Sequence, residues 1–189
     1  MVDQTNSCIA IVGGTFVDLS DPSTAEYDIN AIAHALARVN RYTGHIETDA
    51  YSVAEHCVHV SNAIDQRYAY EGLMHDAAEA FVGDVSSPLK QMLGRTFRDI
   101  EDAFHVELAK RFGFQFPYPS EVHDADKRVY WAERATVAPG PDKLWHQEYR
   151  SSRKVTPEGW DARTATARFL ERFEELYAMR HGEVSREVA

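Results

Sequence analysis

The pair His75-Asp76 is the feature of the sequence best suited to chemistry. It lies in a largely apolar stretch, with Leu73 and Met74 before it and two alanines after it. A histidine and a carboxylate are costly to bury unless each side chain has a partner that needs it. A divalent metal binds neutral imidazole and carboxylate together, so the pair favours a metal site.

Two further candidate ligands lie upstream and downstream of this pair. His56 follows Ser52-Val53-Ala54-Glu55, and Asp126 follows His123-Asp124-Ala125. Taken singly, each of these residues is more often a surface charge or a hydrogen-bonded structural histidine. Together they form the order His, His-Asp, Asp, and this coincidence predicts a four-ligand metal set.

Helical geometry selects His56 over its neighbour His59. The sequence predicts a helix over residues 52–66, because apolar residues recur there at helical spacing. This apolar stripe consists of Val53, Cys57, Val60 and Ile64. At roughly 100° per residue, His56 flanks the stripe while His59 points well away from it, so His56 is the better ligand.

The same geometry selects Asp126 over Asp124. A helix is predicted over residues 120–137, with an apolar stripe of Val122, Ala125, Val129 and Ala132. Asp126 flanks this stripe and Asp124 faces away. Glu133 lies two turns beyond Asp126 and is a candidate to support a metal ligand by a hydrogen bond.

A third helix, predicted over residues 71–82, carries the central pair. On it, His75, Asp76 and Glu79 share one arc, which points away from the apolar face of the helix. That apolar face consists of Leu73, Ala77, Ala80 and Phe81. One helix would thus present two ligands and a nearby carboxylate.

The bulk properties predict an ordinary globular protein. The chain has 189 residues, 44% hydrophobic and 26% charged, which predicts a single domain over residues 1–189. Its formal net charge of −10 argues against binding a nucleic acid polymer. The sequence shows neither a signal peptide nor a membrane-length apolar run, so we expect a cytoplasmic protein without a membrane partner. Cys8 and Cys57 do not form a disulfide framework, and Cys57 is expected in the core.

The remaining pattern is mostly helical. Residues 9–19 predict a β-hairpin that turns at Gly13-Gly14. Further helices are predicted over residues 28–39, from the Pro88 break to Leu93, from 97 to a stop at Gly113, and around Phe169–Tyr177. Pro139-Gly140-Pro141 should end the Asp126 helix, and Trp145 and Trp160 predict packing in the ambiguous range 142–160. The predicted fold is all-α, a compact helical bundle with a small N-terminal β-hairpin.

With this ligand order, the chain resembles the HD-domain metal-dependent phosphohydrolases, and within them the bacterial and phage YfbR-like 5′-deoxynucleotidases. The matching segments are Asn40-Arg41-Tyr42, Ser52 to His56, His75 to Glu79, Gly83-Asp84, Pro88-Leu89-Lys90 and Ala125-Asp126. The resemblance implies an HD-domain helical fold and one metal held by His56, His75, Asp76 and Asp126. It also implies a 2′-deoxynucleotide substrate, with Glu79 and Asp84 working near the phosphate.

The resemblance further implies that Arg41 meets the phosphate and that Tyr42 sits near the sugar or base. Relatives often carry Trp in place of Tyr42, so the base preference does not follow. Related phage enzymes include deoxynucleoside triphosphate hydrolases, some of them selective for dATP. A deoxynucleoside monophosphate is therefore the first expectation for the substrate and a triphosphate the second.

The chemistry of the residues agrees with this implication. A divalent metal, of the Zn, Mn, Co or Fe type with Mg as a further option, supplies Lewis acidity and a low-pKa water. Glu79, one turn from both His75 and Asp76, is placed to orient or deprotonate that water, and Asp84 to share this role or touch the sugar.

Three basic residues are candidates to bind the phosphate. Arg41 offers a planar fork and Lys90 a point charge. Arg41 is expected on one helix face with His34 and Arg38, opposite the apolar stripe. His34 is kept as a substrate-binding candidate, whereas Arg38 fits a solvated face.

Other functions stay open at this stage. A second enzymatic interpretation is a phosphodiesterase or a hydrolase of signalling nucleotides, and a third is a catalytically silent HD fold that senses nucleotides. The presence of Glu79 and Asp84 beside the ligands argues against a catalytically inactive fold.

The aromatic-rich ranges 97–116 and 161–177 offer much apolar surface, so we expect a homo-oligomer, a dimer or larger.

Overall fold

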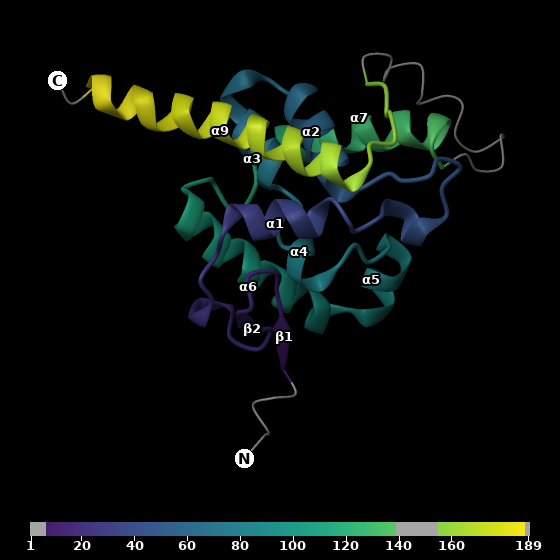
Figure 1. The fold of residues 1–189 in the computed structure, drawn as a ribbon, viewed down its shortest axis with the longest axis horizontal. Helices are drawn as coiled ribbons and strands as arrows, with labels where there is room; N and C mark the ends of the chain where they lie inside the picture. Colours follow the sequence, from purple (N-terminus) through teal and green to yellow (C-terminus); the bar gives the residue numbers. More distant parts are fainter. Residues whose placement is uncertain (1–6, 139–154, 188–189) are drawn as a thin grey trace.

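The predicted fold class is confirmed: helices form a bundle, and a small β-hairpin lies at one end of it (Figure 1). The computed structural model describes residues 7–138 and 155–187, with side chains described up to residue 182. Trp145 and Pro139–Pro141 lie outside these ranges. The helices are α1 Ile29–Leu36, α2 Val53–Asn62, α3 Ala69–Met74, α4 Glu79–Val82, α5 Ser87–Leu93, α6 Arg95–Phe112, α7 Ser120–Thr136 and α9 Ala162–Glu187. Short 3₁₀ turns are η2 Pro22–Thr24, η3 Arg41–Gly44 and η4 Gln66–Tyr68.

The predicted hairpin is confirmed. Strands β1 Cys8–Ala10 and β2 Phe16–Asp18 pair antiparallel, with Ile9 opposite Val17. Gly13 and Gly14 lie in the turn with φ of 101° and 81°, a region that residues with a Cβ rarely adopt. Val17 is buried, so one side of the hairpin covers the end of the core.

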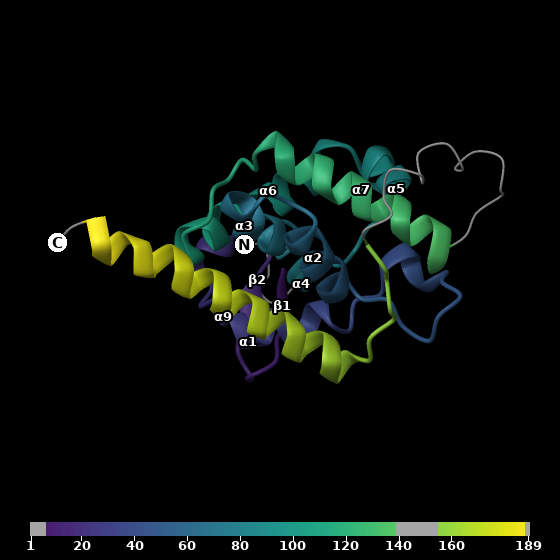
Figure 2. The same cartoon turned by 90° about the horizontal axis from the view of Figure 1, so that it is seen from above.

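Helix α2 lies at the centre of the bundle. Seen from above, α2 and α3 lie between α9 on one side and α7 on the other, and both contact these two helices (Figure 2). The predicted stripe of α2 is fully buried at Val53, Cys57 and Val60. Trp160, just before α9, is buried as predicted, and the C-terminal half of α9 extends beyond the rest of the bundle.

A buried carboxylate on α2 fastens the segment before α9. Glu55 is fully buried and accepts hydrogen bonds from three consecutive backbone amides, those of Glu158, Gly159 and Trp160, at 2.7, 3.0 and 2.6 Å. Gly159 has φ of 74°, and a Cβ there would lie 2.9 Å from the carbonyl oxygen of Ala50. The close packing around Glu55 therefore depends on a glycine at this position.

The first predicted helix ends earlier than expected. Asp28 caps α1 as predicted, accepting from the Asn30 amide at 3.0 Å, but α1 stops at Leu36. The backbone beyond it pairs with a later segment instead: Val53 donates to the Val39 carbonyl and Arg41 to the Tyr51 carbonyl, both at 2.9 Å. Arg41 therefore lies in η3, and the prediction that it shares a helix face with His34 is wrong.

The helix predicted over residues 71–82 is divided into α3 and α4. Residues 75–78 form a turn whose amides reach back three residues, as in Ala77 to the Met74 carbonyl at 3.0 Å. His75 Nδ1 bonds to the Gly72 carbonyl at 2.9 Å. In a continuous helix, this carbonyl would accept a hydrogen bond from a backbone amide instead. The two ligands of the central pair thus lie in a turn rather than in mid-helix.

The other predicted helices agree with the structure within a few residues, except that α9 continues ten residues beyond Tyr177, to Glu187. Helix α2 ends at Asn62 instead of 66, and α7 covers the range predicted around Asp126. Helix α6 ends at Gly113 in the left-handed conformation, as predicted. In the described part of the chain, no helix is both long enough and apolar enough to cross a membrane.

Candidate metal centre and its pocket

Helix α2 and the turn after α3 bring two histidines together. His56 is fully buried and His75 nearly so, and their Nε2 atoms lie 3.3 Å apart. Ser52 caps the start of α2 through its hydroxyl, which accepts from the Glu55 amide at 3.2 Å. The cap fixes where α2 begins and therefore the direction in which His56 points.

Two aspartates complete the cluster. Asp76 Oδ2 lies 3.2 Å from His75 Nε2 and 3.6 Å from His56 Nε2. Asp126 Oδ1, on α7, lies 3.1 Å from His56 Nε2 and 3.9 Å from His75 Nε2. Among the described residues, His56, His75 and Asp126 have ligand atoms within 4.8 Å of one another and could hold a metal ion, and Asp76 forms a second such group with His75 and Cys57.

The Nδ1 hydrogen bonds of the two rings orient both Nε2 atoms into the cluster. His75 Nδ1 bonds to the Gly72 carbonyl, and His56 Nδ1 bonds to Glu133 Oε1 at 2.5 Å, so each Nδ1 carries a proton. A metal ion bound at the two Nε2 atoms would take the place of any proton that they carry. Two nitrogens about 2.0–2.1 Å from one tetrahedral ion lie about 3.3 Å apart, in agreement with the observed separation.

The charges of the cluster also fit a cation. Burial raises the pKa of Asp76, but His75 and the neighbouring cations outweigh burial and hold it well below its usual value. Burial lowers the pKa of His75, but Asp76 outweighs it, and the net pKa lies well above the usual value. The carboxylates therefore favour positive charge near the Nε2 atoms of the two histidines. A divalent ion could supply this charge in place of a proton.

Glu133 connects the metal centre to the pocket wall. It is fully buried, and besides His56 its carboxylate accepts from Tyr51 Oη at 2.8 Å, Tyr42 Oη at 2.6 Å and Arg41 Nε at 3.2 Å. Burial raises the pKa of Glu133, but Arg41 and His56 outweigh it, so the group stays ionised. Glu133, predicted from the sequence to support a metal ligand, therefore accepts hydrogen bonds from four side chains.

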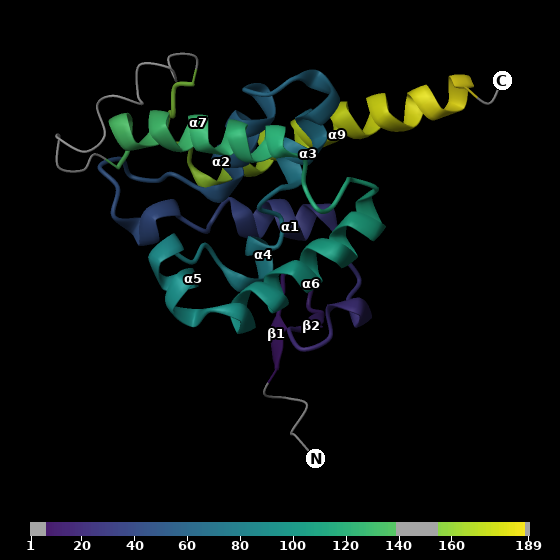
Figure 3. The ribbon, with the colours of Figure 1, turned by 180° about the vertical axis from the view of Figure 1, so that it is seen from behind.

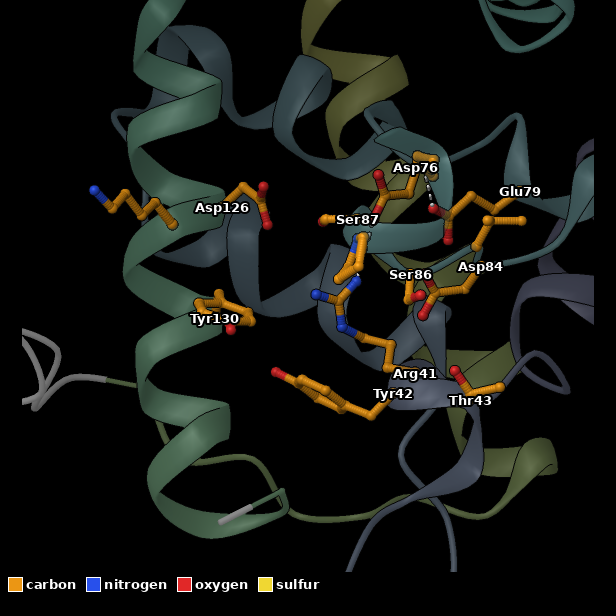
Figure 4. Close-up of a pocket in the computed structure, with 14 residues that line it drawn as sticks. Arg41, Tyr42, Thr43, Asp76, Glu79, Asp84, Ser86, Ser87, Asp126 and Tyr130 are labelled. Carbon is orange, nitrogen blue, oxygen red and sulfur yellow. Dashed lines mark hydrogen bonds and ion pairs between the residues drawn. The ribbon is translucent and has the colours of Figure 1, made fainter. Parts of the chain in front are cut away.

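A pocket of about 420 Å³ opens beside the cluster, lined by residues of α7, η3 and the start of α5 (Figure 4). Helices α5 and α7 lie at the same side of the bundle (Figure 3). This volume lies within the range of small-molecule sites, about 300–1,000 Å³. Its lining residues are Arg41, Tyr42, Thr43, Asp76, Glu79, Asp84, Val85, Ser86, Ser87, Pro88, Lys90, Asp126, Lys127 and Tyr130. Apart from His34, every substrate-binding and catalytic residue predicted from the sequence lines this pocket.

Glu79 is the most unusual carboxylate of the pocket. It is 4% exposed, and its Oε2 has no hydrogen-bond partner among the described residues. Burial, Asp76 and Asp84 together raise the pKa of Glu79 well above its usual value. An unpaired carboxylate oxygen with raised basicity at a pocket wall is suited to take a proton.

Lys90 and Asp84 surround Glu79. Lys90 Nζ lies 3.5 Å from Glu79 Oε1 and 2.6 Å from Glu101 Oε1. Asp84 follows Gly83, whose φ of 77° turns the chain out of α4. Burial raises the pKa of Asp84, and Arg41 partly offsets this.

Arg41 reaches the pocket by a different route from the predicted one. Its Nη1 lies 3.5 Å from Asp76 Oδ2, in addition to its contact with Glu133. The next two residues, Tyr42 and Thr43, both have left-handed backbones, with φ of 58° and 57°. Such conformations cost about 1–3 kcal/mol each in non-glycine residues and persist where the surroundings enforce them.

His34 is placed differently. It lies on α1, does not line the pocket, and its carbonyl accepts from Arg38 Nη1 at 2.8 Å. The reason is the early end of α1, which separates His34 from Arg41.

Sequence reasoning missed pocket residues, among them Tyr130, and two residues that lie near the site, Glu101 and Cys57. Tyr130 lies four residues after Asp126, so the i to i+4 rule for a helix face would have found it. Glu101 comes from α6 and carried no sequence signal, because its distance to Lys90 depends on how α5 and α6 pack. Cys57, predicted as a core residue, is fully buried and lies close to His75 and Asp76.

Comparisons with known proteins add relatives without a known activity. No family model matches the chain. An uncharacterized protein of Rhodobacter capsulatus is 34% identical over 125 residues, which cover 62% of this chain and 64% of the relative. The uncharacterized protein YfdR of Escherichia coli K12 is 32% identical over 117 residues, 62% of this chain and 65% of the relative. The match thus spans just under two thirds of each relative, and the chain is similar to uncharacterized proteins of two bacteria.

Proposed function

We propose that this chain is an HD-type, metal-dependent phosphohydrolase that releases phosphate from 2′-deoxynucleotides. One observation carries the proposal: the candidate ligands His56, His75, Asp76 and Asp126 cluster beside a pocket whose lining also contains three cationic side chains and Glu79, a carboxylate with one unpaired oxygen. The resemblance of the sequence to the YfbR-like 5′-deoxynucleotidases supports the substrate class.

The donor set favours a transition-type metal. Mixed imidazole and carboxylate ligation suits Zn, Mn, Co or Fe better than Ca, with Mg as a further option. When bound, such an ion supplies Lewis acidity and lowers the pKa of a water. Glu133 holds the ring of His56 in place and fixes its tautomer, a contact that commonly tunes metal affinity.

Glu79 is the proposed general base. Its free Oε2 accepts the proton of the attacking water, and Lys90, 3.5 Å from Oε1, stabilises the ionised form before the transfer. Asp84, half-buried on the following loop, is placed to orient the same water or to meet the sugar.

Arg41 and Lys90 are the proposed phosphate ligands. Both line the pocket, and Arg41 is anchored by Glu133 and Asp76 before any substrate arrives. Anchoring removes part of the cost of ordering a long side chain, so the guanidinium is ready to pair with phosphate oxygens. A monophosphate needs no further cation, which is why we place deoxynucleoside monophosphates first and a triphosphohydrolase of the dATP type second.

The test is a hydrolysis screen of purified protein. Deoxynucleoside monophosphates, deoxynucleoside triphosphates and ribonucleotides are incubated with Zn, Mn, Co, Fe or Mg, and phosphate, pyrophosphate and triphosphate are resolved. We expect phosphate from the deoxy monophosphates and weaker turnover of the ribonucleotides. Nucleotide binding without turnover under any metal would instead favour a silent sensor.

Two aspartates of α7 provide a matched control. Asp126→Asn removes a ligand of the cluster, whereas Asp124→Asn changes an exposed carboxylate two residues away on the same helix. We expect metal content and activity to fall in Asp126→Asn alone. Equal metal content in the two variants would contradict the proposed site.

A further inference from the structure

The pocket has two chemically different ends. Toward one end lie the candidate ligands Asp76 and Asp126 together with Glu79, Asp84, Arg41 and Lys90. At the other end, Tyr42 from η3 and Tyr130 from α7 enter from opposite sides (Figure 4). A ligand that fills both ends carries an anionic group at one side and a flat, weakly polar group at the other.

Tyr130 is positioned by the same helix as a metal ligand. It follows Asp126 by four residues, so both side chains project from one face of α7, about 6 Å apart along its axis (Figure 4). The ring is half-buried and lines the pocket. A group bound at Tyr130 is therefore one helical turn away from the centre that would hold the phosphate.

The two tyrosines differ in how firmly they are held. Tyr42 Oη donates to Glu133 at 2.6 Å, which fixes its ring. Within residues 7–138 and 155–182, no hydrogen bond is formed by the hydroxyl of Tyr130, which is held by ring contacts. The edge of Trp131 packs against Tyr130 at 5.0 Å between centroids. One wall is therefore fixed and the other can adjust.

The two rings contact each other across the pocket, and a third ring needs more room. The centroids of Tyr42 and Tyr130 are 6.2 Å apart, with planes inclined by 32°. A flat ring between two parallel rings needs about 7 Å between their planes, twice the carbon contact distance of about 3.5 Å. Arg41 and Arg134 lie against the Tyr42 ring, at 5.7 and 5.6 Å from its centroid, so a base enters between the tyrosines when Tyr130 turns away from Tyr42.

We infer that Tyr130 is a specificity-determining residue that stacks on a planar heteroaromatic base of the substrate, with Tyr42 on the other side. The inference rests on the proposed function, since it places the base in the same pocket as the phosphate. It names the part of the substrate that is recognised: a base, rather than the sugar phosphate alone.

The experiment compares a substrate that carries a base with one that carries a hydroxyl in its place. Wild type, Tyr130→Ala and Tyr130→Phe are assayed with 2′-deoxyadenosine 5′-monophosphate and with 2-deoxyribose 5-phosphate, and the ratio of their kcat/KM values is measured. We expect wild type to favour the nucleotide by more than about 10-fold, because two rings contact the base and one base–aromatic stack alone contributes about 10- to 100-fold. Tyr130→Ala should lower this ratio by about 10- to 100-fold, mainly through KM for the nucleotide, while Tyr42 keeps the remaining preference, and Tyr130→Phe should restore the wild-type ratio.

Equilibrium binding separates failure of the inference from failure of the proposed function. Titration calorimetry of the metal-loaded protein gives Kd for the same two ligands, independently of turnover. Hydrolysis with a ratio that Tyr130→Ala leaves unchanged overturns the inference and keeps the proposed function. Base-dependent binding lost in Tyr130→Ala, without hydrolysis of either compound, keeps the inference and overturns the proposed function. Absence of both binding and hydrolysis overturns both.

Discussion

Replacing Glu133 by glutamine tests whether one buried carboxylate supports both the fold and the metal centre. The change keeps the shape of the side chain, but removes its charge and turns one acceptor oxygen into a donor group. Four donors point at this carboxylate, from His56, Tyr51, Tyr42 and Arg41. An amide oxygen can serve only part of them, so at least one buried donor loses its acceptor.

The magnitude follows from burial. Arg41 and Glu133 form a buried ion pair, and removing one partner of such a pair costs about 3–5 kcal/mol. Asp76 remains 3.5 Å from Arg41 and partly compensates, so we expect the lower end, about 3 kcal/mol of unfolding free energy. Metal affinity should fall by about 10- to 100-fold, as for other partners that orient a ligating histidine.

The contribution of Glu133 to the free energy of unfolding should depend on pH. The pKa of Glu133 in the folded protein lies below its usual value of 4.5, because Arg41 and His56 outweigh burial. Its contribution is therefore fully present above about pH 4.5 and is lost as the pH falls towards the folded pKa. Glu133→Gln should remove this part of the acid sensitivity.

The assay is urea denaturation at pH 7 and at lower pH, with metal titration of the metal-free protein by calorimetry. Glu174→Gln on α9 is the matched control, since Glu174 is exposed and such surface changes stay within about 0.5 kcal/mol. A loss below about 1 kcal/mol together with unchanged metal affinity would refute the role assigned to Glu133.

Three further predictions follow from other residues. Glu79→Ala should lower kcat by at least about 100-fold while metal binding persists, because general-base catalysis contributes about 10²–10⁴-fold; more than about a tenth of wild-type kcat would contradict the role. Burial lowers the pKa of His105 to about 4, so stability should fall as the pH drops from about 6.5 to 4, where the unfolded chain takes up the proton. This loss is at most about 3 kcal/mol, and denaturation of His105→Gln over the same range should show a smaller pH dependence. Self-association through the ranges 97–116 and 161–177 should give a particle larger than 21.4 kDa in light scattering, and a monomer alone would count against it.

The meeting of His56 and Asp126 could be predicted because their directions depend on local periodicity. His56 and Asp126 flank apolar stripes whose residues are buried, and a stripe fixes the direction of every neighbouring side chain. The choice of Asp126 over Asp124 therefore needed no knowledge of tertiary structure. The fold class followed in the same way from the spacing of apolar residues.

The pocket wall was less predictable because it depends on contacts distant in sequence. Arg41 lies outside α1 because its backbone pairs with Tyr51, and no local pattern in the sequence predicts that pairing. The break between α3 and α4 arises from a side-chain bond, His75 to Gly72, that competes with the helix. Glu101 reaches Lys90 only because α5 folds back against α6.

The bonds of Glu55 have a consequence for a chain still being synthesised. Helix α2, which carries His56, leaves the ribosome about a hundred residues before the three amides that Glu55 accepts. Until those amides arrive, the carboxylate next to His56 keeps its water, because burying it without partners is costly. Complete burial of α2 beside Glu55 therefore depends on a segment that the ribosome makes about a hundred residues later. The side chain next to His56 would stay open to water until residues 158–160 arrive, although every candidate metal ligand is already present in the chain by then.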